Sequence, residues 1–466
     1  MKRRNRVIGA FIAASALFAA ACSDDSSSSD TTSASTEAPG TTGATDSSEP
    51  MTTDSMPMTT DSMPMDDMWM VDTDLCVDPG AANAPIQGTI NVASVMPLTG
   101  GAAAAAFEPV ARGMQAYIDY ANENGLLGDL QIELTIEDDQ YNAELTPGAV
   151  AARLDDGADI FSGIIGSANN AAVRDTLNQN CIPQLNNLTG SPLWGDVANY
   201  PWTTGQLVPY TIESKVYAAN IREQHPDGAK VALFNVNNEF GQVHVDAFNE
   251  IADEFGIEIV GQETIEATDQ APPTAQITNI AALAPDAIMA VPLGAQCIGF
   301  LTEVANAKAA NPGWDPQVYI TNTCASSLIL GASGAAADGL YTSGNGIDVV
   351  NPANADIPEV AEYLAYMDSK GLSDIAATAA AGWTTGEITV AILKQAMESP
   401  EGLTRASIIN AARNFDFHAS LLLPGINYKL SGETDVYLAE SLIVRQYDAD
   451  TATFTDIGDV VTEFES

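Results

Sequence analysis

Apolar and polar residues are patterned over residues 87–450 in a way that predicts alternating strands and helices. Short runs with β-branched residues or a period of two indicate strands, and apolar residues three and four apart indicate helices. The predicted strands are 89–94, 131–137, 160–166, 182–185, 230–236, 258–263, 287–291, 317–321 and 340–343, and the predicted helices are 108–124, 146–155, 171–180, 210–224, 241–255, 276–283, 299–311, 357–370 and 382–397. Strand–helix alternation predicts an α/β protein with mostly parallel sheets flanked by helices. The pattern restarts near residue 210, so we expect two lobes with a cleft between them.

The first 22 residues have the pattern of an export signal. Four basic residues precede an apolar run at 7–21, and Cys22 follows Leu17-Phe18-Ala19-Ala20-Ala21. This segment resembles the lipobox of bacterial lipoproteins, which predicts cleavage after residue 21, a diacylglycerol on Cys22 and an extracytoplasmic, membrane-anchored protein. A transmembrane anchor is the alternative, but the run is shorter than the roughly 20 residues that span a bilayer.

Residues 22–87 predict a disordered tether followed by an N-terminal extension. Ser, Thr, Asp and Met dominate residues 23–74, which contain too little apolar surface to offset the entropy of ordering. The sequence MTTDSMP occurs twice in tandem, at 51–57 and 58–64. We interpret this stretch as a flexible spacer; Cu(I) binding by its thioethers is the alternative.

The acidity of the chain limits its partners. The formal net charge is −45, with 62 acidic and 17 basic residues. Nucleic acid is excluded as a partner because phosphate binding needs clustered Lys and Arg. We interpret the acidity as a solvated surface suited to salty water, where screening weakens self-repulsion.

A set of ordered motifs resembles the branched-chain amino acid type of substrate-binding protein, the type I periplasmic fold that serves ABC importers. The motifs are Ile90-Asn91-Val92-Ala93 before Pro97-Leu98-Thr99-Gly100, Arg112-Gly113-Met114-Gln115-Ala116 before Asn122-Glu123-Asn124-Gly125, Glu137-Asp138-Asp139, Gly163-Ile164-Ile165-Gly166-Ser167, and Asn235 to Gly241. The resemblance covers residues 88–450. It implies two lobes joined by a three-stranded hinge, and we expect 88–207 plus 342–396 in lobe 1 and 208–341 plus 397–466 in lobe 2.

The resemblance also implies where a ligand binds. In open parallel sheets, ligands bind beyond the carboxyl ends of the strands, so the loops there are the candidates. The expected ligand-binding residues are Phe107, Ser167, Ala168, Asn169, Asn170, Asn187, Thr189, Phe240, Ala295, Gln296 and Thr323.

One departure from the family pattern concerns ligand charge. Amino-acid-binding members have an acid after the strand that here ends near Asn322, whereas this chain has Thr323. Burying an ammonium group without a carboxylate is costly. An α-amino acid is therefore not the expected ligand unless Asp138 or Glu239 supplies the missing charge, and an amide, a urea-like compound, a small carboxylate or an aromatic acid fits the neutral site as well.

Four cysteines remain beside Cys22, and outside the cell they predict disulfides; buried free thiols are the alternative. Cys297 and Cys324 each follow a strand in what should be neighbouring positions, so we expect them to pair. Cys76 and Cys181 remain, and their pairing would attach the extension to lobe 1.

The predicted function is capture of a small polar molecule, such as an amino acid, amide or small carboxylate, and its delivery to an ABC transporter permease. A ligand-binding sensory component with the same fold is the alternative. With only three His and no metal-spaced or nucleophile motif, we expect no enzyme activity, cofactor or metal, and a monomer.

Overall fold

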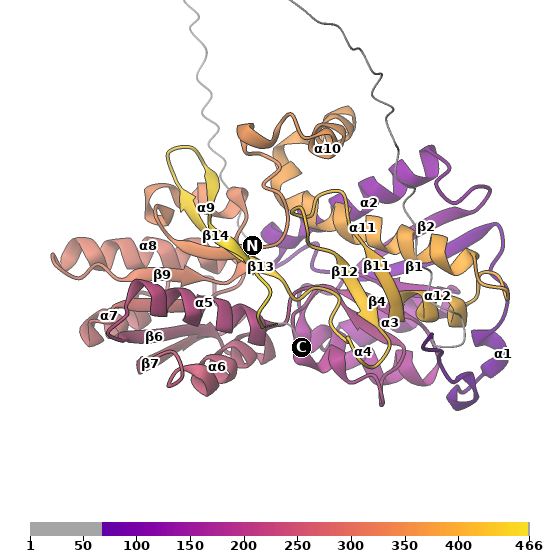
Figure 1. The fold of residues 1–466 in the computed structure, drawn as a ribbon, viewed down its shortest axis with the longest axis horizontal. Coiled ribbons are helices and arrows are strands. Elements are labelled where there is room, and N and C mark those ends of the chain that lie inside the picture. Colours follow the sequence, from indigo (N-terminus) through magenta and orange to yellow (C-terminus); the bar gives the residue numbers. More distant parts are fainter. Residues whose placement is uncertain (1–67, 465–466) are drawn as a thin grey trace, which may run out of the picture. The chain divides into compact units, whose positions relative to one another are not determined.

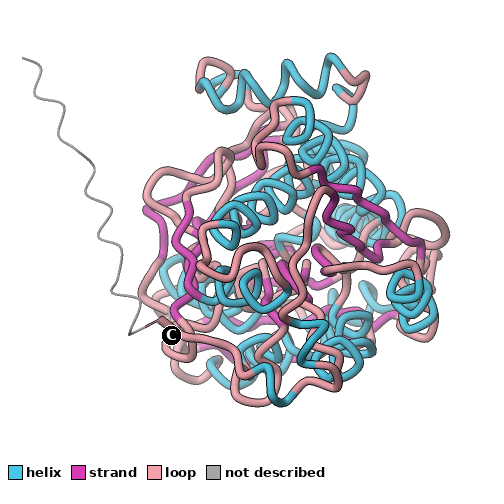
Figure 2. The backbone as a smooth tube through the Cα atoms, turned by 90° about the vertical axis from the view of Figure 1, so that its right-hand side faces the viewer, coloured by secondary structure: helices cyan, strands magenta, loops and turns pink. Residues whose placement is uncertain are grey.

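The computed structural model describes residues 68–464, which form two large sheets flanked by helices and a small two-stranded sheet (Figures 1 and 2). The first sheet is parallel and has the order β2-β1-β3-β4-β5. Its strands are β1 (Thr89–Met96), β2 (Gln131–Asp138), β3 (Ile160–Ser162), β4 (Gln184–Asn187) and β5 (Thr203–Gly205), connected by helices α2 (Ala104–Glu123), α3 (Thr146–Asp155) and α4 (Ser167–Gln179).

The second sheet has the order β14-β13-β10-β9-β8-β6-β7. Its parallel strands are β6 (Ala229–Val236), β7 (Ile257–Ile265), β8 (Ala287–Val291), β9 (Gln317–Ile320) and β10 (Tyr341–Gly344), and its antiparallel edge is β13 (Leu442–Asp448) and β14 (Thr453–Val461). The helices of this lobe are α5 (Tyr210–Gln224), α6 (Glu239–Ile251), α7 (Thr274–Leu283), α8 (Ala295–Ala310) and α9 (Ser327–Ser333). The predicted two-lobed α/β fold is confirmed.

Within the described residues the chain crosses between the lobes three times, at 206–209, 345–357 and 432–441. Two expected boundaries are wrong. Strand β10 belongs to the second sheet, although we expected lobe 1 to resume at residue 342. Residues 397–431, expected in lobe 2, belong to lobe 1 together with α10 (Pro358–Ser369) and α11 (Ala376–Met397).

The misassigned segment consists of α12 (Arg405–Arg413) and a hairpin of β11 (Asn414–Phe417) and β12 (Tyr428–Ser431). Its apolar side chains join the core of the first lobe, including Ile408 and Ile409, which are fully buried. The buried Arg413 donates hydrogen bonds to the backbone carbonyls of Pro201 and Thr203. These long-range contacts place residues 397–431 in lobe 1, and the local pattern of residues does not encode them.

Part of the expected N-terminal tether is folded. The Trp69 and Val71 N–H groups donate to the Asn414 and Asn410 side chains at 3.0 and 2.8 Å. Short helical turns follow at Thr73–Leu75 and Pro79–Ala82, and the expected Cys76–Cys181 disulfide holds this segment to lobe 1. The prediction of a disordered tether up to residue 74 is therefore wrong for 68–74, and the extension that follows is attached to lobe 1 as expected. Cys22, the signal segment 1–21 and the repeats at 51–64 lie outside the described residues.

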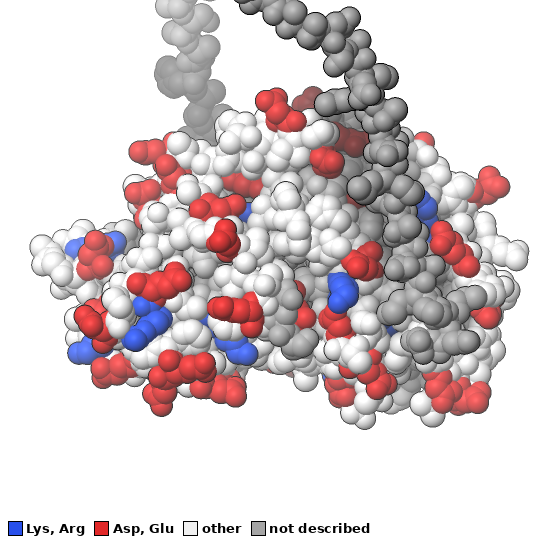
Figure 3. Space-filling view, viewed as in Figure 1, with Lys and Arg blue, Asp and Glu red and all other residues white. Residues whose placement is uncertain are grey.

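Acidic side chains are spread over the visible face, with few basic ones among them (Figure 3). Described ion pairs such as Lys308–Asp315 and Lys370–Glu123 lie at the surface, where screening by solvent leaves them weak. None of the described helices is both long enough and apolar enough to cross a bilayer.

Helices α2 and α11 pack in backbone contact. A Cβ atom added to Gly113 would lie 1.9 Å from the Ala379 carbonyl oxygen, and one added to Gly382 would lie 1.8 Å from the Val110 carbonyl oxygen. Real Cβ atoms do not approach the backbone this closely, so both positions require glycine for the two helices to pack this close together.

We expect Gly113→Ala to lower the free energy of unfolding by about 1–3 kcal/mol, because the added methyl group forces α2 and α11 apart. Gly148→Ala is the matched control, since no atom lies within 4 Å of its added Cβ and alanine favours the helix by up to about 1 kcal/mol. Urea unfolding of both variants measures the difference. Equal midpoints would contradict the packing argument.

Candidate ligand-binding site

A cavity of about 290 Å³ lies where the two lobes meet. Its walls come from α2, the starts of α5 and α6, the segment around Thr323, the end of β10 with the crossing that follows it (residues 343–349), α11, and residues 421–428. Most lining side chains are apolar or aromatic. This size is close to the lower limit of about 300 Å³ for small-molecule sites.

Two pairs of aromatic rings line the cavity, one pair from each lobe. Phe107 and Tyr141 of lobe 1 stack with ring centroids 6.0 Å apart, and Tyr210 and Phe240 of lobe 2 meet edge to face at 5.2 Å. The structure thus brings the predicted Phe107 and Phe240 to one cavity. Two of these rings were not predicted from the sequence: Tyr141, which follows the Asp138-Asp139 pair, and Tyr210, which begins α5.

The expected polar loop after the third strand is the first turn of α4, because that helix begins at Ser167 and not at the predicted residue 171. The Ser167 and Thr189 hydroxyls bond to each other at 2.6 Å. The Asn169 amide donates to Asp139, and the Asn170 amide to the Ile164 carbonyl, both at 2.8 Å. Neither these side chains nor Ala168 and Asn187 line the cavity; the nearby residues that do are Ile165, Gly166 and Leu188.

Ala295 and Gln296 support the cavity from outside its lining. The Gln296 amide donates to the Glu266 and Asp269 carbonyls at 2.9 Å each, which fixes the start of α8. The Ala295 N–H donates to the Ala102 carbonyl of the other lobe at 2.9 Å. A Cβ on Gly294 would lie 2.2 Å from that same carbonyl oxygen, so glycine is required where the lobes touch.

Two further hydrogen bonds join the lobes beside the cavity. The Ser191 hydroxyl donates to the Glu239 carboxylate at 2.8 Å, and the Ser326 and Thr378 hydroxyls lie 2.5 Å apart. Together with the Ala102–Ala295 bond, they hold the lobes against each other around the cavity.

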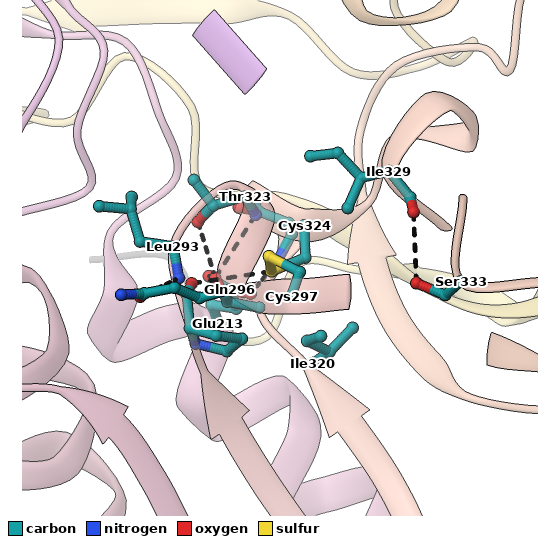
Figure 4. Close-up of a disulfide and its surroundings, with 12 residues drawn as sticks. Glu213, Leu293, Gln296, Cys297, Ile320, Thr323, Cys324, Ile329 and Ser333 are labelled. Atoms are coloured by element: carbon teal, nitrogen blue, oxygen red, sulfur yellow. Dashed lines mark hydrogen bonds between the residues drawn. A yellow bond between two sulfur atoms is a disulfide. The ribbon is translucent and has the colours of Figure 1, made fainter. Parts of the chain in front are cut away.

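The wall that contains Thr323 is fixed by a disulfide and a buried acid (Figure 4). The expected Cys297–Cys324 disulfide is present and connects α8 to the short turn Asn322–Cys324. Below it, the fully buried Glu213 accepts the Asn322 N–H at 2.7 Å and the Tyr217 hydroxyl at 2.8 Å. Glu213 was not predicted from the sequence, where its only signal is an acid near Tyr210 and Tyr217 on the apolar face of a helix.

Burial raises the pKa of Glu213 to about 7 and lowers the pKa of His244 to about 3. The His244 Nε2 atom lies 3.6 Å from a Glu213 oxygen. His244 is therefore neutral near pH 7, and Glu213 is poised between its two charge states.

Neither Asp138 nor Glu239 lines the cavity as a partner for a ligand ammonium. Asp138 accepts from the Leu98 and Gln140 N–H groups, and Glu239 accepts from Ser191. The charged residues that do line the cavity are Asp348 and Arg445, and each has protein partners. Among residues 68–464, no three His, Cys, Asp or Glu side chains gather as a metal site.

Glu213→Gln tests the role of the buried acid in pH-dependent stability. The folded pKa of about 7 lies above the ordinary 4.5, so this group's contribution is fully present below pH 4.5 and is lost as the pH rises through 7. The unfolding free energy of wild type minus that of the variant should fall by about 3 kcal/mol between pH 4.5 and 7.

Subtracting the variant matters because His244, with its lowered pKa, changes stability in the opposite direction between about pH 3 and 6.5. Denaturant unfolding at several pH values gives both curves. A difference that does not change with pH would refute the raised pKa.

Known proteins share this fold. Residues 89–447 match the family described as periplasmic binding protein. A branched-chain amino acid ABC transporter protein from Thermus thermophilus with bound valine has 17% identity and a TM-score of 0.73, covering 81% of this chain and 97% of its own. A fatty acid ABC transporter substrate-binding protein from Thermomonospora curvata has 16% identity and a TM-score of 0.67, covering 82% and 93%.

A third solved structure is a solute-binding protein of an ABC transporter from R. palustris in complex with 4-hydroxybenzoate. It has 17% identity and a TM-score of 0.66, covering 80% of this chain and 97% of its own. No curated protein sequence matches the chain significantly. At these identities the solved structures establish the shared fold. The family match extends from the first strand of lobe 1 to β13, and the chain therefore belongs to the periplasmic binding protein family.

Proposed function

We propose that this protein is the extracytoplasmic solute-binding component of an ABC importer, anchored by a lipid on Cys22, and that it binds a small molecule with an apolar body between its lobes. The observation that carries the proposal is the largely apolar cavity at the meeting point of the lobes. Proteins of this fold close around ligands by hinge motion of their lobes.

The cavity favours a ligand without an α-ammonium group. Of the two charged side chains that line it, Asp348 accepts the Phe454 N–H at 3.2 Å and Arg445 pairs with Asp456 at 2.8 Å. An ammonium group here would be desolvated without a free carboxylate, which costs several kcal/mol. The proposed ligands are therefore amides or carboxylates with an apolar body, and amino acids are removed from the predicted range.

Two uncharged amides are suited to recognise the polar end of the ligand. The side chains of Asn322 and Asn345 line the cavity, and the structure gives neither a hydrogen-bond partner among the described residues. Each offers a donor and an acceptor. We assign Phe107, Phe240 and Thr323 to ligand contact, and we assign Ser167, Asn169, Asn170, Thr189, Ala295 and Gln296 to support of the walls.

The names of the structural relatives indicate that proteins with this fold bind ligands of different chemistry. Valine, a fatty acid and 4-hydroxybenzoate appear in the names of the three relatives above. Two of these compounds lack an ammonium group and have an apolar body. The lining residues, and not the fold, therefore decide the ligand.

We expect Thr323→Glu to weaken binding of the preferred ligand at least about tenfold, because it introduces a carboxylate without a partner into the cavity. Thr302→Glu, on the exposed face of α8, is the matched control and should bind as wild type does.

Calorimetry with hexanoate, hexanamide, 4-hydroxybenzoate, leucine and valine measures the effect. Wild type should bind at least one of the first three and neither amino acid. Micromolar binding of leucine by wild type would contradict the assignment of an ammonium-free ligand.

The membrane anchor is tested by Cys22→Ala, which removes the thiol that would carry the lipid. The variant should move from the membrane fraction to the soluble fraction, while Ser23→Ala should stay with the membrane. Metabolic labelling with a fatty acid followed by fractionation reports both properties. A labelled Cys22→Ala protein would show that the anchor lies elsewhere.

A further inference from the structure

The cavity continues from the aromatic pairs toward the crossings between the lobes, where its lining changes. In place of rings from α2 and α6, it is lined there by a set of mostly aliphatic side chains from the second crossing and its neighbours. We name this part the hinge chamber and define it by Ile347, Val349, Leu421, Leu422, Tyr428 and Phe454.

The backbone of the hinge chamber is already hydrogen-bonded within the protein. The Ile347 N–H donates to the Leu421 carbonyl at 2.8 Å, and the Leu423 N–H donates to the Asn345 carbonyl at 2.9 Å. Gly346 and Leu422 form an antiparallel bridge between these bonds. The crossing segment is therefore paired like a short strand, and few backbone groups remain to bind a polar ligand.

The charges beside the chamber are also satisfied. Arg445 donates to the Gly346 carbonyl at 2.6 Å as well as to Asp456. The carboxylate of Asp348 accepts the Phe454 N–H from the neighbouring strand. A charged or strongly polar ligand group would lose water in the chamber without gaining a partner, whereas a hydrocarbon would lose nothing.

We propose that the hinge chamber is a subsite for an aliphatic tail, so that the ligand is elongated, with its polar group near Asn322 and Asn345 and its tail against the aliphatic side chains of the chamber. This inference rests on the proposed binding function and specifies the class of ligand. It also predicts that affinity depends on tail length, because each methylene that reaches the chamber is removed from water.

The experiment measures binding of butanoate, hexanoate, octanoate and decanoate, and of the corresponding primary amides, by calorimetry on the full extracytoplasmic chain. For wild type, affinity should increase about fourfold per added methylene, the equivalent of about 0.8 kcal/mol, until the chamber is filled. The amides separate recognition of the polar end from recognition of the tail.

Two variants at one position should shift the optimum in opposite directions. Ile347 is half-buried and lines the chamber, so Ile347→Trp should shorten the longest tail that still gains affinity, and Ile347→Ala should lengthen it. Loss of folding cannot produce opposite shifts. Val350→Trp is the control, since Val350 lies in the same segment, is 37% exposed and does not line the cavity.

Each result bears on the proposal. An optimum tail length that is the same in wild type and both Ile347 variants overturns the hinge subsite. Wild type that binds compact solutes such as 4-hydroxybenzoate but shows no dependence on tail length also overturns it, and leaves the binding function standing. If wild type binds no member of either series and none of the compact solutes, both the hinge subsite and the binding function are refuted.

Discussion

The close approach of helices α2 and α11 is the constraint on which the cavity depends. Gly113 and Gly382 let the two backbones touch, as the positions of Ala379 and Val110 show. The cavity-facing end of α2 then presents Phe107, and the start of α11 presents Thr378, which bonds to Ser326 of the other lobe. A bulkier residue at either glycine would displace both walls of lobe 1 together, although neither glycine lines the cavity itself. In this lobe, the packing of α2 against α11 therefore also sets the positions of the residues that would contact a ligand.

Sequence periodicity located most elements because each is decided by local pattern. Helices Thr146–Asp155 and Tyr210–Gln224 and strand Ala287–Val291 have the predicted bounds. The disulfides were also predictable, since Cys297 and Cys324 follow adjacent strands and leave Cys76 for Cys181. The lobe of residues 397–431 was not predictable in this way, because a buried arginine bonded to distant carbonyls decides it.

The candidate site was less accessible to sequence reasoning than the fold. Polar residues at the predicted loop, such as Asn169 and Asn170, form hydrogen bonds within the fold, since α4 begins four residues earlier than its apolar pattern shows. The hinge chamber draws on four separate stretches of chain, none of which has a distinctive local pattern. Glu213 lies one layer behind the cavity and acts through the Asn322 N–H. Residues that come from the crossings between the lobes, or that lie behind the cavity wall, have no local pattern by which a single sequence would reveal them.

Three of the hydrogen bonds between the lobes, at Ala102–Ala295, Ser191–Glu239 and Ser326–Thr378, affect how often the lobes adopt the arrangement seen here, which we call the closed form. They involve no ligand atom, so they favour the closed form equally whatever occupies the cavity. Every 1.4 kcal/mol that they contribute shifts the open–closed equilibrium tenfold, and while the open form predominates it raises the apparent affinity for all ligands by the same factor. Selectivity and overall affinity can therefore change independently in this protein. The lining of the cavity discriminates between solutes, and the hydrogen bonds between the lobes set the apparent affinity for every solute that binds.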